Sequence, residues 1–157
     1  MMKHRIAQFV GILTFLLIGT FVLPIGITHV DAHPGARPIP HCAGEQCNGQ
    51  PVDAGCSADA AIIKYTTIGS NSSTSAVLTI LQSKACNIYY AQLRSLGGTR
   101  LMSLSILRGS LSYESGSQYT KLITSPMVAV GTGTVIVTGI AHAGGSDHPI
   151  ILSYPEK

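Results

Sequence analysis

The sequence predicts an all-β domain, a small disulfide-stapled sandwich or barrel, preceded by a signal-peptide helix. Three observations lead to this fold class. Four cysteines, at Cys42, Cys47, Cys56 and Cys86, follow an apolar leader. From residue 60 onward, short segments rich in Ile, Val and Thr alternate with turns rich in Gly, Ser and Asn. Outside the leader, no stretch of useful length keeps the 3.6-residue period of an amphipathic helix.

The leader, residues 1–32, is predicted to be a cleaved signal peptide. Lys3 and Arg5 precede an apolar run over residues 6–30, and a Val-Asp-Ala motif ending at residue 32 fits signal peptidase. A run of this length is also long enough to remain as an uncleaved membrane anchor. Both alternatives place the rest of the chain outside the cytoplasm, because basic residues stay on the cytoplasmic side. We expect a secreted or extracytoplasmic, cell-surface protein that meets a membrane only through residues 6–30, if they are retained.

Residues 33–41 are predicted to be a spacer and residues 42–157 a single β-rich domain. The spacer has three prolines in nine residues, which favours an extended conformation. Over the whole chain, 10 Lys and Arg stand against 7 Asp and Glu, a formal net charge of +3. These charges are spread along the chain, so we expect no nucleic-acid partner, which would need clustered cations.

The cysteines are expected to form two disulfides within a segment that otherwise reads as an irregular loop. Exported cysteines are normally oxidised, and the spacing C-x4-C-x8-C-x29-C lacks the paired C-x2-C of common zinc sites. Four cysteines allow three pairings. We favour Cys42–Cys47, which closes locally, together with Cys56–Cys86, which ties the loop to the strands. We expect no metal and no cofactor.

Strands are predicted wherever β-branched residues or alternation dominate. The clearest alternation is around Met102, Leu104 and Ile106, which would face a core while the serines between them face solvent. The Gly-Thr-Gly-Thr sequence at 131–134 predicts a hairpin that joins 127–130 to 135–142. The full set of expected strands is 60–68, 76–82, 88–94, the segment around 102–106, 127–130, 135–142 and 150–154.

The Cys-rich segment resembles the bacterial domain-of-unknown-function 2690 family. The resemblance rests on C-x4-C-N-G-Q-P-x3-G-C-S-A-D-A from residue 42, then Cys86-x3-Tyr90-Ala91, and a later Ser-Pro-Met-Val ending at residue 128. It covers roughly residues 42–130. Gln50, Tyr90 and Gln92 stand where the family usually has Asp, Trp and Arg. The resemblance implies an exported or surface-exposed bacterial domain with no established activity, so it assigns no catalytic residues.

Three polar side chains near the cysteines are candidate ligand groups. Asp59 faces a ligand in one interpretation, or joins Asn48 and Asp53 in a weak Ca²⁺ site. Calcium needs six to eight oxygen ligands, and this segment lacks the repeated Asp and Asn positions that would supply them. In the alternative interpretation, the three side chains cap turns by accepting hydrogen bonds from nearby backbone N–H groups.

Two further groups of residues are candidates for contact with a ligand. One group lies close together in the sequence and consists of His142, Asp147 and His148. These side chains would bind a divalent metal, or Asp147 would orient His148 as a base. In the alternative interpretation, the two glycines between them simply form a turn. Tyr89 and Tyr90 belong to a set of tyrosines that would stack on sugars or else be half-buried in the core. The other members of that set are Tyr65, Tyr113 and Tyr119.

These observations favour a non-enzymatic secreted or cell-envelope module, binding or structural, whose partner is a cell-wall glycan or another envelope protein. We assign no catalytic residue, because no Gly-x-Ser-x-Gly motif is present and oxidised cysteines leave no thiolate. One alternative is a secreted hydrolase-like enzyme that uses His142, Asp147 or Asp59. Another is a membrane-anchored extracytoplasmic sensor domain.

Overall fold

The computed structural model describes residues 39–69, 75–143 and 146–156. The predicted leader, residues 1–32, and most of the predicted spacer lie outside these residues. Within the described part of the chain, no helix is both long enough and apolar enough to cross a membrane.

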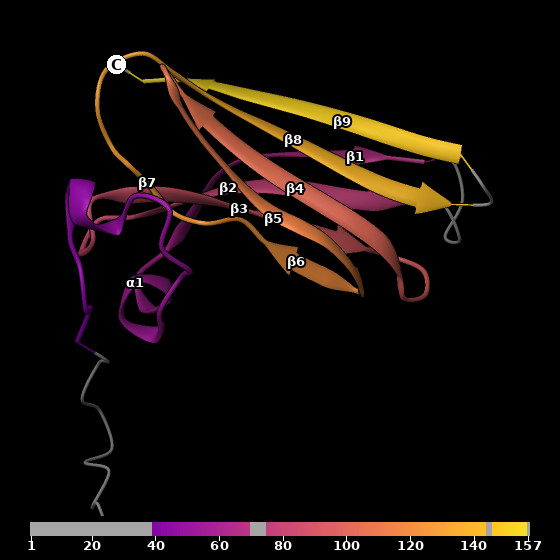
Figure 1. Cartoon of the computed structure of the whole chain (residues 1–157), viewed down its shortest axis with the longest axis horizontal. Coiled ribbons are helices and arrows are strands. Elements are labelled where there is room, and N and C mark those ends of the chain that lie inside the picture. The colour runs from indigo at the N-terminus through magenta and orange to yellow at the C-terminus, as the bar shows by residue number, and fades with distance from the viewer. Residues whose placement is uncertain (1–38, 70–74, 144–145, 157) are drawn as a thin grey trace, which may run out of the picture. The chain divides into compact units, whose positions relative to one another are not determined.

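Two antiparallel sheets make up the domain (Figure 1). The first has the order β1-β2-β3-β6, and β7 pairs with β3 beyond the end of β6. The second has the order β5-β4-β8-β9. The all-β prediction is confirmed, and because the sheets do not close on each other the fold is a sandwich. The strands are β1 (Ala61–Ile68), β2 (Ala76–Ser83), β3 (Ile88–Ser95), β4 (Arg100–Arg108), β5 (Leu111–Thr120), β6 (Leu122–Thr124), β7 (Val128–Ala129), β8 (Thr134–Ala143) and β9 (Ser146–Pro155).

The core lies between the sheets and follows from the alternation in the sequence. Met102, Leu104 and Ile106 of β4 are at most 1% exposed, whereas the serines between them are half-buried. They pack with residues of the facing sheet, among them Leu78 and Leu93. Full burial of one such side chain stabilises the fold by about 1.5–3 kcal/mol. This face therefore supplies much of the driving force for sandwich formation.

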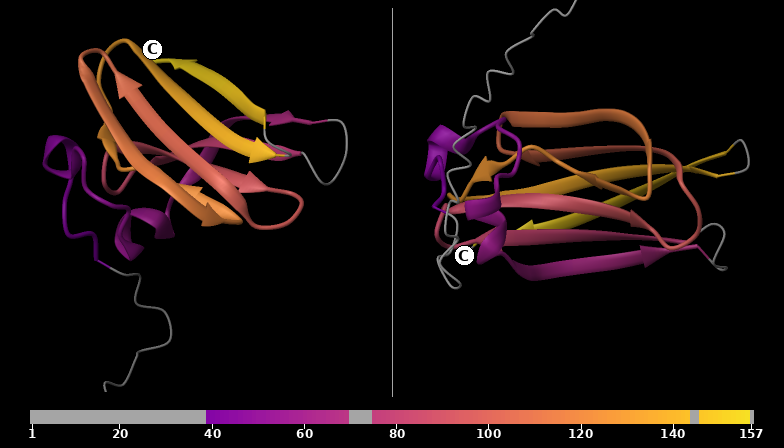
Figure 2. Two further views of the ribbon diagram at one scale, coloured as in Figure 1. Left: turned by 45° about the vertical axis from the view of Figure 1, so that its right-hand side comes forward. Right: turned by 90° about the horizontal axis from the view of Figure 1, so that it is seen from below.

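The Cys-rich segment contains two short helices, where the sequence predicted an irregular loop. The 3₁₀-helix η1 spans Gly44–Cys47 and the α-helix α1 spans Ala54–Ala58. Each is little more than one turn, too short for a 3.6-residue pattern to be recognised in the sequence. Figure 2 shows that this segment lies at one end of the sandwich. It covers part of the outer face of the first sheet, where a second, smaller apolar cluster forms around Tyr90 and Met127.

The predicted hairpin over residues 127–142 is wrong. β7 pairs with β3 in the first sheet, whereas β8 pairs with β4 and β9 in the second. The Gly-Thr-Gly-Thr sequence is therefore part of a crossover between the two sheets. Arg108, the last residue of β4, links the two sheets beside this crossover. Its guanidinium donates a hydrogen bond to the carbonyl of Ala129 in β7. A glycine-rich link permits either geometry, and the burial of each flanking strand against its own sheet decides between them.

Strand β5 was not among the expected strands. Its sequence, Leu-Ser-Tyr-Glu-Ser-Gly-Ser-Gln-Tyr-Thr, is almost entirely polar, and its side chains are exposed or half-buried. It is an edge strand that, among the strands the structure describes, pairs with β4 alone. An edge strand buries little of its surface, so hydrophobic alternation is weak there and gives little signal.

Candidate functional site

Two disulfides fix the Cys-rich segment to the sandwich. Cys42 is bonded to Cys47, with their Cα atoms 5.3 Å apart, and Cys56 is bonded to Cys86, with their Cα atoms 5.4 Å apart. This is the pairing that the sequence favoured. Cys86 lies in the turn between β2 and β3, so the second bond attaches helix α1 to the first sheet. Two disulfides are typical of proteins that fold in an oxidising, extracytoplasmic compartment.

Asp53 and Asn48 bind backbone groups of the segment and its surroundings. The carboxylate of Asp53 caps helix α1 by accepting a hydrogen bond of 2.7 Å from the N–H of Cys56, and it accepts another of 3.0 Å from the N–H of His41. These bonds, with that from Cys56 first, lower the pKa of Asp53. The Oδ1 atom of Asn48 accepts a hydrogen bond of 2.7 Å from the N–H of Ala129 in β7. Asp53 acts as a cap, as the second interpretation of the sequence proposed. Asn48 does not cap a turn with its side chain, because its partner Ala129 lies 81 residues away, and it ties the segment to β7 instead.

Asp59 is likewise engaged by protein groups. Its two carboxylate oxygens accept hydrogen bonds from the hydroxyl of Ser83, at 2.6 Å, and from the N–H of Ala85, at 2.8 Å. The hydrogen bond from Ser83 is the largest cause of a lowered pKa for Asp59. The side chain thus fastens the start of β1 to the turn between β2 and β3.

Tyr89 and Tyr90 point to opposite faces of β3, and neither offers an open ring face. Tyr89 is 4% exposed in the main core, with its ring centroid 6.1 Å from that of Tyr154. Burial, followed by the nearby charge of Glu156, raises the pKa of Tyr89. Tyr90 is 2% exposed beneath the Cys-rich segment, and burial with the charge of Asp59 raises its pKa. Stacking of a sugar on either ring is therefore blocked by protein atoms.

His142 and Asp147 form a cross-strand pair on β8 and β9. The distance from Nδ1 of His142 to Oδ1 of Asp147 is 2.5 Å, and the side chains are 32% and 66% exposed. The side chain of His148 lies outside the described part of the structure. Figure 1 places this end of β8 opposite the end that carries α1, so the pair is remote from Asp59.

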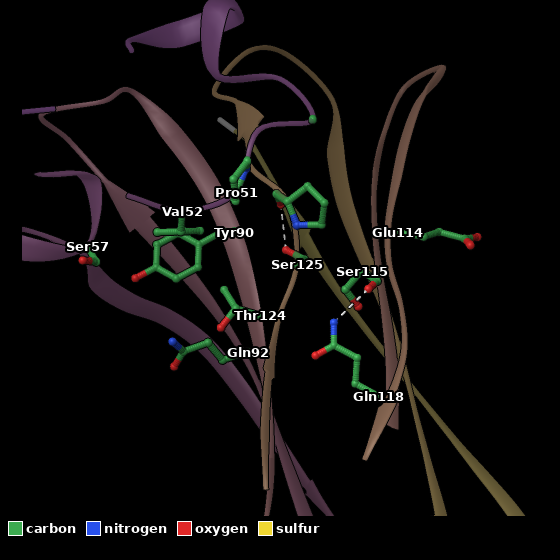
Figure 3. Close-up of a pocket in the computed structure, with 12 residues that line it drawn as sticks. Pro51, Val52, Ser57, Tyr90, Gln92, Glu114, Ser115, Gln118, Thr124 and Ser125 are labelled. Atoms are coloured by element: carbon green, nitrogen blue, oxygen red, sulfur yellow. Dashed lines mark hydrogen bonds between the residues drawn. The ribbon is translucent and has the colours of Figure 1, made fainter. Parts of the chain in front are cut away.

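A pocket of about 520 Å³ lies where the Cys-rich segment meets β3, β5 and the link from β6 to β7. Figure 3 shows the lining side chains from these elements, with the largely buried Tyr90 beside Val52 on one side and Ser115 and Gln118 on the other. Apart from the tyrosine hydroxyl, its polar side chains are amides, hydroxyls and one carboxylate. They are Ser57, Gln92, Glu114, Ser115, Gln118, Thr124 and Ser125.

A bulge in β5 shapes the side of the pocket opposite Tyr90. The register of β4 and β5 shifts between Ser103 and Ser105, and Gly116 adopts a φ of 70° at the irregularity. Bulges of this kind re-aim side chains and are frequent near binding sites. Here the hydroxyl of Ser115 donates a 3.0 Å hydrogen bond to the carbonyl of Leu104. Nε2 of Gln118 donates a 3.4 Å hydrogen bond to the carbonyl of Ser115.

The pocket is suited to hydrogen bonding with an uncharged ligand. Glu114 is the one charged residue in its lining, and in Figure 3 that side chain points away from the other polar groups. The residues that line it include no histidine, cysteine or lysine. Gln92 and Gln118 each carry both a donor and acceptors in one planar amide, which allows them to bind hydroxyl groups in either sense.

Among the pocket residues, the sequence indicated only Tyr90 as a candidate for ligand contact. Gln92, Gln118 and Thr124 were missed because they come from three strands, and nothing local marks them as neighbours. A comparison with protein-family models, with curated proteins and with solved structures finds no match to this chain.

Proposed function

We propose that this protein is a non-enzymatic, secreted or cell-envelope binding module that binds an uncharged cell-wall glycan in the pocket beside Tyr90. The observation that carries the proposal is the pocket lining, which combines amides and hydroxyls with one outward-pointing carboxylate. Neutral sugars are rich in hydroxyl groups, and a site with a few placed polar groups orients such a ligand. The resemblance of the Cys-rich segment to an exported bacterial family supports the secreted or cell-envelope location in this proposal.

Export belongs to the same proposal, and intact mass tests it directly. Protein recovered from the host is expected to have the mass of residues 33–157 less four hydrogens, and to resist alkylation because every cysteine is oxidised. A mature N-terminus at His33 would rule out the membrane-anchored sensor. A full-length species with alkylatable thiols in the membrane fraction would contradict both the cleavage and the oxidised state.

Glycan binding is tested with purified wall polysaccharide and the oxidised protein in isothermal titration calorimetry. We expect Gln118→Ala and Gln92→Ala each to weaken binding by roughly 5- to 30-fold, since a lost hydrogen bond costs about 1–2 kcal/mol. Gln46→Ala is the matched control, because this glutamine is exposed on η1 and lies outside the pocket. Equal binding by all three variants would place the ligand elsewhere, and absence of binding by the unchanged protein would reject the glycan.

The hydrolase alternative has one supporting observation, the 2.5 Å pair of His142 and Asp147. A carboxylate in this position can orient an imidazole as a base. Turnover of chromogenic esters or glycosides, lost in His142→Ala and kept in Gln118→Ala, would favour this function over the binding module.

A further inference from the structure

The sulfur atoms of the two disulfides form one cluster. The Sγ atoms of Cys42, Cys47 and Cys56 all lie within 4.8 Å of one another, so one bond lies beside a sulfur of the other. Cys47, Cys56 and Cys86 are fully buried, whereas Cys42 is partly exposed. Among the four cysteines, Cys42 is therefore the one that a thiol in solution reaches most easily, and access is a main determinant of cysteine reactivity.

We propose that the Cys42–Cys47 disulfide is a site of thiol–disulfide exchange with low-molecular-weight thiols, and that Asp53 confines the exchange to this bond. The thiolate of the external thiol bonds to Sγ of Cys42, and the bond from Cys42 to Cys47 breaks. Cys47 leaves with the electron pair and takes up a proton. A second thiol then displaces Cys42 as a thiol, so two external thiols are oxidised to one disulfide while the protein gains two electrons and two protons.

Opening of this bond is a local event. The Cys42–Cys47 bond joins residues only 5 apart in sequence, and residues 48–50, which follow Cys47, are held in place by other contacts. The N–H of Gly49 donates to the carbonyl of Met127, and the N–H of Met127 donates to the carbonyl of Gln50, both at 2.9 Å. With the 2.7 Å bond to Oδ1 of Asn48, these contacts keep the released Cys47 next to Cys56.

Asp53 opposes passage of the exchange to the inner disulfide. If Cys47 attacked Sγ of Cys56, the bond to Cys86 would break and negative charge would develop on Cys86. A carboxylate oxygen of Asp53 lies within 4.8 Å of the sulfur atoms of both Cys56 and Cys86. A like charge at this distance disfavours the thiolate, and a thiol of raised pKa is a poor leaving group. The lowered pKa of Asp53 keeps its carboxylate ionised at neutral pH.

The first test uses the unmodified oxidised protein and reduced glutathione. Samples taken at neutral pH are quenched with acid, alkylated and mapped by peptide mass spectrometry. We expect the first modified species to carry glutathione on Cys42 and the alkyl group on Cys47, with Cys56 still bonded to Cys86. A first adduct on Cys56 or Cys86, or simultaneous loss of both disulfides, would overturn the proposal.

The second test generates the Cys47 thiol without any reductant, by means of Cys42→Ser. This variant is compared with C42S/D53N, in which asparagine keeps the oxygen that caps α1 but loses the charge. We expect Cys47 to remain the main free thiol in C42S, and the species with Cys47 bonded to Cys56 and a free Cys86 to rise roughly 3- to 10-fold in C42S/D53N.

C42S/D59N is the matched control, because Asp59 also binds the turn around Cys86 but is not part of the sulfur cluster. It is expected to resemble C42S. Equal amounts of the rearranged species in all three variants would remove Asp53 from the proposal. The glutathione test on the unmodified protein is decisive by itself for the site of attack, whatever the folding yield of the variants.

Discussion

Asp59 lies between helix α1 and strand β1, and both of its carboxylate oxygens bind the turn that joins β2 to β3. The hydroxyl of Ser83, which donates to Asp59, also accepts a hydrogen bond of 3.1 Å from the N–H of Cys86. Ser83 is fully buried, so its hydroxyl has no water to replace a lost partner. The carboxylate thus completes a short hydrogen-bond chain that reaches a disulfide.

We expect Asp59→Ala to lower the free energy of unfolding by about 1–3 kcal/mol, because it leaves the hydroxyl of Ser83 and the N–H of Ala85 without their acceptor. Urea denaturation at pH 7 with the disulfides intact measures the change. Asp147→Ala is the control, since that carboxylate is 66% exposed and its loss is expected to cost less than about 1 kcal/mol. Similar losses for the two variants would show that the chain at Ser83 contributes little.

Acid is expected to destabilise the protein through Asp53 and Asp59. Hydrogen bonds lower the pKa of both carboxyls, chiefly from the N–H of Cys56 to Asp53 and from the hydroxyl of Ser83 to Asp59. Below the unfolded value of about 3.9, the unfolded chain therefore binds more protons than the folded one. The contribution of the two groups is present above about pH 4 and is lost as the pH falls through their folded pKa values.

Urea midpoints measured from pH 7 to pH 2 test this dependence. The unchanged protein is expected to lose stability below about pH 4, and the double variant D53N/D59N to show a shallower loss because neither site titrates. Parallel curves would mean that other carboxyls govern the acid transition.

At the scale of elements, Gly55 determines how closely helix α1 approaches the chain before it. A Cβ atom at this position would lie 2.4 Å from the Cα and N atoms of Pro40, which are backbone atoms and cannot rotate away. The close approach therefore requires glycine. The resemblance of the Cys-rich segment to a family pattern includes this Gly-Cys pair, and the structure gives the glycine a steric reason.

We expect Gly55→Ala to destabilise the domain by about 1–3 kcal/mol, as overpacked sites do, by displacing residues 39–41. Thermal unfolding under non-reducing conditions measures this effect. Gly98→Ala is the matched control, because a Cβ there meets no atom within 4 Å. Equal midpoints for the two variants would contradict the close approach of α1 to Pro40.

Local sequence pattern predicted the faces of single strands but not which sheet each strand joins. The alternation of β4 predicted its inward face correctly, because alternation reports burial on one side of a strand. The link at 131–134 was misassigned because glycines permit a turn without requiring one. The choice of sheet for β7 and β8 depends instead on contacts such as that of Arg108 with Ala129, which are 21 residues apart in sequence.

For the whole molecule, the two disulfides are expected to contribute unequally. They close sequence separations of 5 and 30 residues. In the chain-entropy model, the longer staple contributes about 3.7 kcal/mol and the shorter about 2.2 kcal/mol. We expect the pair C56A/C86A to lose more stability than C42A/C47A, and to lose more packing because both of its sulfurs are fully buried whereas Cys42 is partly exposed. Guanidinium denaturation of both double variants makes the comparison, and a larger loss for C42A/C47A would contradict it.

The sequence by itself determined the all-β class, the inward faces of the strands with clear alternation, and a disulfide pairing favoured on sequence separation. The strand class and the inward faces depend on neighbours in the chain, so local pattern carries the information, and the short Cys42–Cys47 loop is local as well. The Cys56–Cys86 bond spans 30 residues and follows once the first pair is chosen. Only the tertiary structure decided which sheet each strand joins, that β5 is a strand, and that Gln92, Gln118 and Thr124 line one pocket. These features depend on contacts between residues far apart in sequence. Their free energy comes from burial and pairing across the fold, which no short segment encodes.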